Sequence, residues 1–246
     1  MTHAAYEIIG AERETRWLLT CDHASNAVPA EIHGGSLGLP DEDMSRHIAY
    51  DVGAAGVTRA LAQRLGATAV LGTFSRLVID PNRGEDDPTL VMRLYDGSII
   101  PGNRHADSDE VERRLETYHR PYHAAIARMA ARRPDTVIVP IHSFTRQLRG
   151  RRPRPWHVTV LHAGEGPLAP ALLAELGKHD ELCVGENEPY PGHLFGDTVD
   201  RHALRTGRLN ALIEIRNDLI ADHEGQIAWA DRLAPALERA LAATDI

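Results

Sequence analysis

The sequence predicts a single α/β domain with a mostly parallel β-sheet. Short apolar runs rich in β-branched residues alternate with longer segments of helical spacing, which is typical of repeated strand–helix units. Several apolar runs end abruptly at polar residues, including His23 and His142, as strands do where they deliver side chains to the end of a sheet. The 246 residues and 43% hydrophobic content suffice for one large core, so we predict one domain over 1–246.

The first segments predict a strand, a loop and a helix. Residues 1–15 are interpreted as a short lead-in, and the apolar run within 16–21 predicts a buried strand. Proline and glycine residues over 27–42 predict a loop, and a loop of this length beside a candidate site is often functional. From about Asp41 the apolar residues recur at helical spacing until Gly66, so a helix is predicted there.

The middle of the chain predicts two strands, an irregular excursion and a long helix. Apolar runs at 67–71 and 77–79 predict the strands, and the polar, turn-rich residues 84–107 predict an excursion over the sheet. An apolar stripe from about Ser108 to Met129 predicts the long helix. Pro121 lies inside this helix and is expected to bend it.

The last part of the chain again alternates between β-branched runs and helical spacing. We predict strands at 136–141, 156–161, 182–185 and 209–215, and helices at 168–177 and 222–243. The run 146–155 is basic and irregular. It predicts either a solvated loop or a segment that attracts an anionic substrate.

Composition excludes several classes of function. The net charge of -8 argues against a nucleic-acid-binding protein. No apolar run approaches the length of a membrane span, and the start at Met1–Ala4 lacks the pattern of a signal peptide. Cys21 and Cys183 form no Cys-x-x-Cys pair and are expected to be thiols of a cytoplasmic protein. The sequence says nothing about oligomeric state.

The candidate site lies where strands end or carry charge. His23 is a candidate metal ligand or catalytic base. The alternative interpretation is that Asp22 and His23 hydrogen-bond each other and only shape the loop. Glu214 and Arg216 alternate along a late strand and are expected on the same face. Since buried charges need partners, this pair predicts either a simple salt bridge or a catalytic carboxylate held by arginine.

Two histidines, an oxygen ligand and a nearby carboxylate make a hydrolytic set. Catalytic zinc takes three protein ligands and leaves a position for water, whose pKa the metal lowers. A glutamate then moves the proton from that water to the leaving amine. Such a set cleaves amides without a nucleophilic serine or cysteine, and Ser25 and Ser143 are not in a nucleophile elbow.

Seven motifs in order resemble the N-formylglutamate amidohydrolase family. They are Cys-Asp-His-Ala-Ser-Asn at 21–26 with Pro29, His-Ile-Ala-Tyr-Asp-Val-Gly-Ala at 47–54, Ser-Arg-Leu-Val-Ile-Asp-Pro-Asn-Arg at 75–83, Pro-Tyr-His at 121–123, His-Ser-Phe-Thr at 142–145, Asn-Glu-Pro-Tyr at 187–190 and Glu-Ile-Arg-Asn-Asp-Leu-Ile at 214–220. They cover most of the chain. No single motif is specific, but the ordered set is.

This family is similar to zinc carboxypeptidases in fold. The resemblance implies a phosphorylase/hydrolase-like, three-layer α/β/α architecture around a mixed sheet. It implies that His23 and His142 are zinc ligands and that Glu214 is the catalytic glutamate. It also implies that Asn82 and Arg83 grip a substrate carboxylate, for which an arginine fork is suited.

The sequence departs from the carboxypeptidase pattern at the third ligand. A glutamate is expected three residues after the first histidine, and Asn26 stands there. We predict Asp51 as the third ligand, with Asn26 or a second water as alternatives. Asn26 is otherwise a candidate substrate-binding residue.

The remaining polar residues have a structural interpretation beside the functional one. His119 and His123 are four apart on a helix, yet Arg120 replaces the glutamate of a zincin motif, so both are interpreted as structural. His162 is also interpreted as structural. His202 is placed on a loop, where it is either solvated or in contact with substrate. Arg76 either pairs with Asp80 or reaches the substrate.

We therefore predict a zinc-dependent amidohydrolase of a small N-acyl amino acid, with N-formylglutamate as the first candidate. Zinc, or another divalent metal, is expected on His23, Asp51 and His142. Glu214 is the expected base and acid, and Arg216 is expected to orient it or to stabilise the oxyanion. The alternatives are a carboxypeptidase-like peptidase, another deacylase, or a non-catalytic binder of acidic metabolites.

Overall fold

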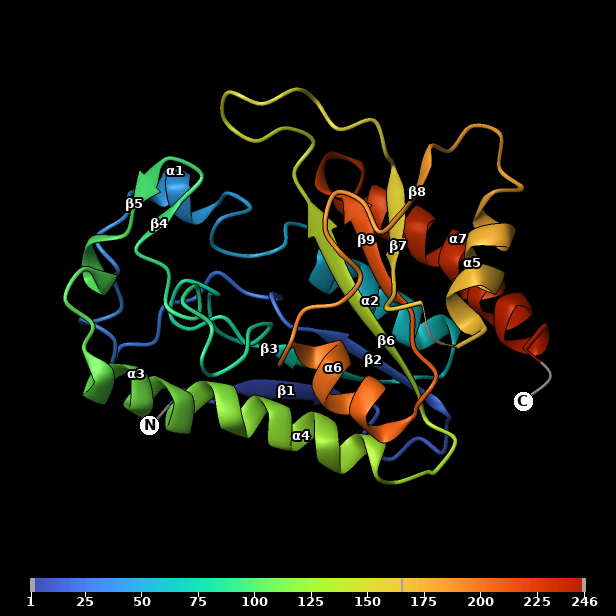
Figure 1. The fold of residues 1–246 in the computed structure, drawn as a ribbon, viewed down its shortest axis with the longest axis horizontal. Coiled ribbons are helices and arrows are strands. Elements are labelled where there is room, and N and C mark those ends of the chain that lie inside the picture. The colour runs from blue at the N-terminus through green and yellow to red at the C-terminus, as the bar shows by residue number, and fades with distance from the viewer. Residues whose placement is uncertain (1–2, 165, 245–246) are drawn as a thin grey trace.

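A computed structural model describes residues 3–164 and 166–244, and within them a mixed seven-stranded sheet lies between two layers of helices (Figure 1). Met1 and Thr2 of the predicted lead-in lie outside the described residues. The strands are β1 (Tyr6–Ile9), β2 (Trp17–Cys21), β3 (Thr68–Gly72), β6 (Val137–Phe144), β7 (Val158–Leu161), β8 (Val184–Glu186) and β9 (Leu212–Arg216), in the spatial order β1-β3-β2-β6-β9-β7-β8. The predicted three-layer α/β fold is confirmed.

The centre of the sheet is parallel and its two sides are not. Strands β3, β2, β6 and β9 run in one direction, whereas β1 is antiparallel to β3 and β7 is antiparallel to β9. The register pairs His142 of β6 with Glu214 of β9. The carboxyl ends of β2, β6 and β9 therefore meet at one edge of the sheet, which is where ligands bind in such folds.

Each face of the sheet packs against its own helices. The helices are α1 (Asp41–Met44), α2 (Ala54–Arg64), α3 (Ser108–Arg114), α4 (Arg120–Ala130), α5 (Leu168–Leu176), α6 (Thr198–His202) and α7 (His223–Ala242), with short 3-10 turns at Pro101–Asn103, Leu204–Thr206 and Asn217–Leu219. Along β2, Leu19 faces the core under α2, α5 and α7, and Leu18 faces the core under α4 and α6. This alternation with a period of two is what buries both faces of a central strand.

A long excursion, residues 73–107, covers the carboxyl edge of the sheet and carries a small hairpin, β4 (Leu94–Tyr95) with β5 (Ser98–Ile99). Arg114 of α3 is fully buried beneath it. Its guanidinium donates to the carbonyl of Val78 and to the side chain of Asn103, each at 2.7 Å. Asn103 in turn donates to the carbonyls of Leu77 and Met92. These bonds satisfy buried backbone groups that a sheet would otherwise pair.

Four segments differ from the sequence-based predictions. The helix predicted over 41–65 is two helices, and residues 45–53 between them form turns. Residues 77–79 are not in a strand, because their apolar side chains are buried in a separate cluster with Phe74, Leu90 and Ile100 of the excursion instead of in the sheet. The lead-in contains β1, whose short alternation was too weak to identify. The five-residue helix α6 was also missed, because it is shorter than two turns.

The predicted long helix is interrupted by a π-helical turn, Leu115–His119, between α3 and α4. Pro121 lies in the first turn of α4, where a missing backbone N–H is tolerated. The interruption therefore stands just before the proline, as a proline-induced defect would.

Candidate functional site

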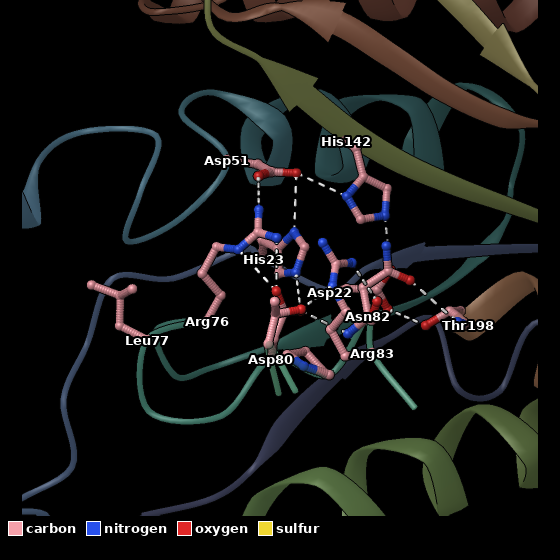
Figure 2. A network of polar contacts seen from close by, with 12 residues as sticks. Asp22, His23, Asp51, Arg76, Leu77, Asp80, Asn82, Arg83, His142 and Thr198 are labelled. Atoms are coloured by element: carbon pink, nitrogen blue, oxygen red, sulfur yellow. Dashed lines mark hydrogen bonds and ion pairs between the residues drawn. The ribbon is translucent and has the colours of Figure 1, made fainter. Parts of the chain in front are cut away.

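Three buried side chains meet at the carboxyl edge of the sheet and could hold a metal ion. His23 follows β2, His142 lies on β6, and Asp51 lies in the turn before α2 (Figure 2). Their candidate ligand atoms all lie within 4.8 Å of one another. Asp51 Oδ2 lies 2.8 Å from His142 Nδ1 and 3.4 Å from His23 Nδ1. Two imidazole nitrogens and one carboxylate oxygen are a ligand set that suits catalytic zinc.

Each histidine is oriented by a second carboxylate on its other ring nitrogen. Asp80 Oδ1 accepts from His23 Nε2 at 2.7 Å, and Asp22 Oδ2 accepts from His142 Nε2 at 2.8 Å. Such carboxylate–histidine pairs fix the tautomer, so that Nδ1 of each ring is free to bind a metal. The residues present therefore fit a zinc ion.

The outer carboxylates are held ionised by their own partners. Burial opposes ionisation of Asp22, but hydrogen bonds and charge from His142 lower its pKa to about 2. Tyr122 and Thr198 also donate to Asp22 Oδ1, at 2.8 and 2.6 Å. Burial likewise opposes ionisation of Asp80, and the guanidinium of Arg76 keeps its pKa well below the usual range.

Backbone geometry places Asp51 at the site. The Asp51 amide donates to the carbonyl of His23 at 2.9 Å, which joins the turn before α2 to the end of β2. Gly53, the N-cap of α2, has a φ of 81°, and a Cβ there would lie 2.1 Å from the carbonyl oxygen of Ile220. Only glycine fits both the left-handed conformation and the close approach, so Gly53 fixes where this turn lies.

The three ligands open into a cavity of about 190 Å³ that also contains the side chain of Glu214. Glu214 Oε2 is buried and has no hydrogen-bond partner among the described residues. Burial raises the pKa of Glu214 to about 7, the range that suits a group that both accepts and donates a proton. The cavity thus brings a candidate acid–base group to a candidate metal site.

The cavity wall on the β3 side carries the predicted carboxylate-binding residues. Asn82 and Arg83 both line the cavity. The Arg83 guanidinium donates to Thr89 and to the carbonyl of Asn82, and no carboxylate pairs with it among the described residues. Arg76 also lines the cavity, but its guanidinium forms ion pairs with Asp80 at 2.7 Å and with Asp51 at 3.5 Å. The predicted pairing of Arg76 with Asp80 is therefore present, and contact of Arg76 with a substrate stays a prediction.

The N-formylglutamate amidohydrolase family model matches residues 15–221, most of the chain. The chain belongs to this family. A curated N-formylglutamate deformylase of Pseudomonas putida is 31% identical over 125 residues. That match spans 45% of this chain and 43% of the Pseudomonas protein, so less than half of the curated relative is matched.

Solved structures of similar proteins cover the whole architecture of this family member. Gene product Atu2144 of Agrobacterium tumefaciens is 36% identical, with a TM-score of 0.93 over 99% of this chain and 97% of that one. N-formylglutamate amidohydrolase of Ralstonia eutropha JMP134 is 20% identical, with a TM-score of 0.70 over 99% of each chain. The similarity to the Ralstonia structure shows that the two proteins share a fold. Among the described residues, no helix is both long enough and apolar enough to cross a membrane.

Three predicted site residues of this family member lie away from the cavity lining. Asn26 is exposed, and its amide donates to the carbonyl of Met44 at 2.9 Å. Arg216 donates to Asp218 at 2.7 Å, and no hydrogen bond or ion pair joins it to Glu214 among the described residues. His202 is buried on α6 rather than solvated on a loop. His202 therefore does not lie on a loop, and Arg216 does not contact Glu214 among the described residues, whereas the roles of Asn26 and His202 toward a substrate stay predictions.

Asp22 is a residue of the candidate site that is not predicted from the sequence. It was interpreted as a possible partner of His23, whereas it holds His142 from across β2 and β6. Strand alternation offers the signal, because Asp22 continues the face of Leu18 and His142 continues the face of Ile138. His162, interpreted as structural, bonds Glu186 at 2.9 Å.

His119, His123 and His202 form a buried cluster beside the site. His123 Nε2 lies 2.9 Å from the carbonyl oxygen of Pro81, so it carries the proton and donates. His123 Nδ1 then accepts from His202 Nε2 at 2.9 Å. Burial lowers the pKa of all three, that of His202 to about 4. The cluster is therefore neutral at pH 7.

This cluster makes stability fall on acidification. The pKa of His202 is lower in the folded than in the unfolded chain, so the unfolded chain binds more protons between about pH 6.5 and pH 4. We expect His202 alone to lower the free energy of unfolding by about 2 kcal/mol from pH 7 to pH 5. Urea titration of the wild type and His202→Gln tests this. An equally steep pH dependence in both proteins contradicts it.

Proposed function

We propose that this chain is a zinc-dependent amidohydrolase that removes the acyl group from a small N-acyl amino acid, with N-formylglutamate as the substrate. One observation carries the proposal: the buried His23, Asp51 and His142 group shares a cavity with the unpaired carboxyl of Glu214. Family membership supports the reaction class, and the printed name of the Pseudomonas relative supports the substrate.

The ligands would hold the metal through Nδ1 of the two histidines and a carboxylate oxygen of Asp51. When bound, zinc lowers the pKa of water and polarises a carbonyl oxygen. Asp22 and Asp80 keep the two imidazoles in the tautomer that this role requires.

Glu214 performs both proton transfers in this mechanism. Its carboxylate accepts a proton from the attacking water and then donates it to the nitrogen of the leaving amino acid. A pKa of about 7 allows both directions near neutral pH. Asn82 and Arg83 hold the α-carboxylate of the substrate, so that the scissile amide lies against Glu214.

The size of the cavity favours a small substrate over a polypeptide. About 190 Å³ accommodates an acylated amino acid, whereas a peptidase needs further subsites along a cleft. The two cysteines are free, which agrees with the cytoplasmic location that we propose from composition.

Formate release from N-formylglutamate tests the proposal directly. Purified protein, stripped of metal and then given zinc, is expected to release formate only after zinc is added, and to leave N-acetylglutamate intact or nearly so. Metal bound with no release from either substrate overturns the substrate. Absence of both metal and release, with retained affinity for acylglutamate, identifies a non-catalytic binder.

A further inference from the structure

Arg154, at the end of the basic run 146–155, lies against two aromatic rings of the cavity wall. Its guanidinium lies 5.1 Å from the ring centre of Tyr190 and 5.8 Å from that of Phe144. Both rings line the cavity. The side chain also donates to the carbonyl of Thr145 at 3.1 Å, and the Arg154 backbone amide donates to Arg146 at 2.8 Å. The Arg154 side chain is therefore held beside the cavity wall by these contacts and does not extend into solvent.

No carboxylate pairs with Arg154 among the described residues. By contrast, Arg76 is paired with Asp80, and Arg46 is paired with Asp43 and Asp96. A guanidinium that lies over ring faces keeps N–H groups at its edge for an anion. Arg83 lines the cavity and also has no carboxylate partner among the described residues. Arg154 does not line the cavity itself but contacts Phe144, Thr145 and Tyr190, which do. Arg83 in the lining and Arg154 beside it are thus both available to anionic groups of a ligand.

The charge of Arg154 acts on the cavity. Burial is the main reason that the pKa of His47, a cavity-lining residue, falls to about 4. Asp96 opposes this change, whereas Arg46, Arg76 and Arg154 lower the pKa further. His47 is therefore neutral at pH 7 and supplies no positive charge to the cavity.

The two available arginines come from opposite halves of the sheet. Arg83 belongs to the excursion that follows β3, whereas Arg154 precedes β7 and its ring partner Tyr190 follows β8. In the spatial order of the strands, β6 with His142 and β9 with Glu214 lie between these halves. Figure 1 shows the segment between β6 and β7 rising above the sheet, and Arg149 within it donates its backbone amide to Asp96 of the β4–β5 hairpin at 3.0 Å. A ligand with two carboxylates can therefore be held on both sides of the reaction centre.

We propose that Arg154 determines specificity by binding the side-chain carboxylate of the substrate. This inference rests on the proposed function, in which Arg83 holds the α-carboxylate and Glu214 faces the amide. Arg154 then selects N-acyl amino acids with acidic side chains over neutral isosteres. A bidentate arginine–carboxylate pair supplies the geometry for that choice.

The test compares N-formylglutamate with N-formylglutamine, which differs only in the side-chain carboxylate. We expect the wild type to prefer the glutamate compound in kcat/KM by about 100-fold, the worth of a charge-assisted hydrogen-bonded pair. Arg154→Met is expected to remove most of this preference by raising KM for N-formylglutamate, while kcat for that substrate stays within about threefold of the wild-type value. Arg154→Lys keeps the positive charge but lacks the two-pronged guanidinium. Its substrate preference is expected to lie between those of the wild type and Arg154→Met.

Two arginine variants serve as matched controls. Arg152→Met removes the same charge from an exposed position in the same segment and is expected to change neither substrate by more than about twofold. Arg83→Met is expected to weaken both substrates alike, because both carry the α-carboxylate. If the ratio of kcat/KM for N-formylglutamate to that for N-formylglutamine is the same in Arg154→Met as in the wild type, Arg154 does not have the proposed role.

Calorimetry in the Glu214→Gln background tests binding without turnover. Arg154→Met is expected to weaken N-formylglutamate binding at least about tenfold and to leave N-formylglutamine unaffected. Equal weakening of both ligands overturns the proposal, and thermal melting shows whether the variant is folded. If the wild type releases formate from neither substrate, the proposed reaction is refuted. The calorimetric comparison then still shows whether Arg154 recognises the side-chain carboxylate.

Discussion

Glu214→Gln is expected to lower kcat for formate release by about 10³- to 10⁴-fold while the bound metal stays at the wild-type amount. The amide of glutamine fills the same space but cannot accept the proton of the attacking water. Because Glu214 is buried without a hydrogen-bond partner and is not among the three candidate ligands, the change removes chemistry rather than structure. Steady-state kinetics and metal analysis of the same preparation measure the two effects separately.

The matched control for this substitution is Glu238→Gln, an exposed glutamate on α7. It removes the same charge far from the cavity, and its kcat is expected to equal that of the wild type. A Glu214→Gln enzyme that retains more than a tenth of wild-type kcat excludes Glu214 as the acid–base group. Loss of metal in the Glu214→Gln variant would instead indicate that Glu214 is itself a metal ligand.

Asp51→Asn is expected to lose the metal as well as activity. The Asp51 carboxylate is the only anionic member of the candidate ligand group, and its Oδ2 lies near Nδ1 of both histidines. Outer residues of metal sites already contribute 10- to 100-fold to affinity, so loss of a ligand charge should weaken zinc by more than about 100-fold. Competition with a chromophoric chelator measures the affinity.

Asn26→Ala separates the two candidates for the third ligand. Asn26 stands where a carboxypeptidase glutamate is expected, yet its amide is bound to the carbonyl of Met44. We expect this variant to bind zinc like the wild type. Asp51→Glu keeps the charge and should retain part of the affinity, which distinguishes ligand loss from the loss of the Arg76 contact. Full zinc binding by Asp51→Asn would refute the assignment.

Much of the candidate site is predictable from strand ends. His23 and His142 each follow or end an apolar run, and the carboxyl ends of parallel strands converge at one edge, so these residues could be expected to meet. Glu214 breaks a strand that is otherwise apolar, and a buried charge of this kind needs a reason. Asp51 was predicted because it was expected on the helix after the first loop. It lies instead in a turn, which depends on contacts of Gly53 with a segment more than 160 residues away.

Three predicted site residues lie outside the cavity lining because other residues bind their side chains. Arg216 has the strand face predicted by alternation, but Asp218 lies two residues on and binds its guanidinium. His202 lies on α6, a helix too short to show periodicity, where His123 from a distant helix bonds it. Asn26 lies three residues after His23, yet the turn there directs it to Met44. Such pairings depend on the packing of turns and short helices, which residue spacing does not encode.

The π-helical turn Leu115–His119 joins α3 to α4. We expect the orientation of α4 relative to α3 to depend on the number of residues in this turn more than on which residues they are. Arg114, just before it, holds the excursion by Val78, and Tyr122, just after it, holds Asp22. One extra residue per turn sets the phase between these two anchors, and each residue of an α-helix turns the chain by about 100°. Deleting a single residue there would rotate Tyr122 away from the Asp22 carboxylate while α4 stayed helical. Sequence drift on the exposed face of this helix is therefore tolerable, whereas a one-codon deletion is not.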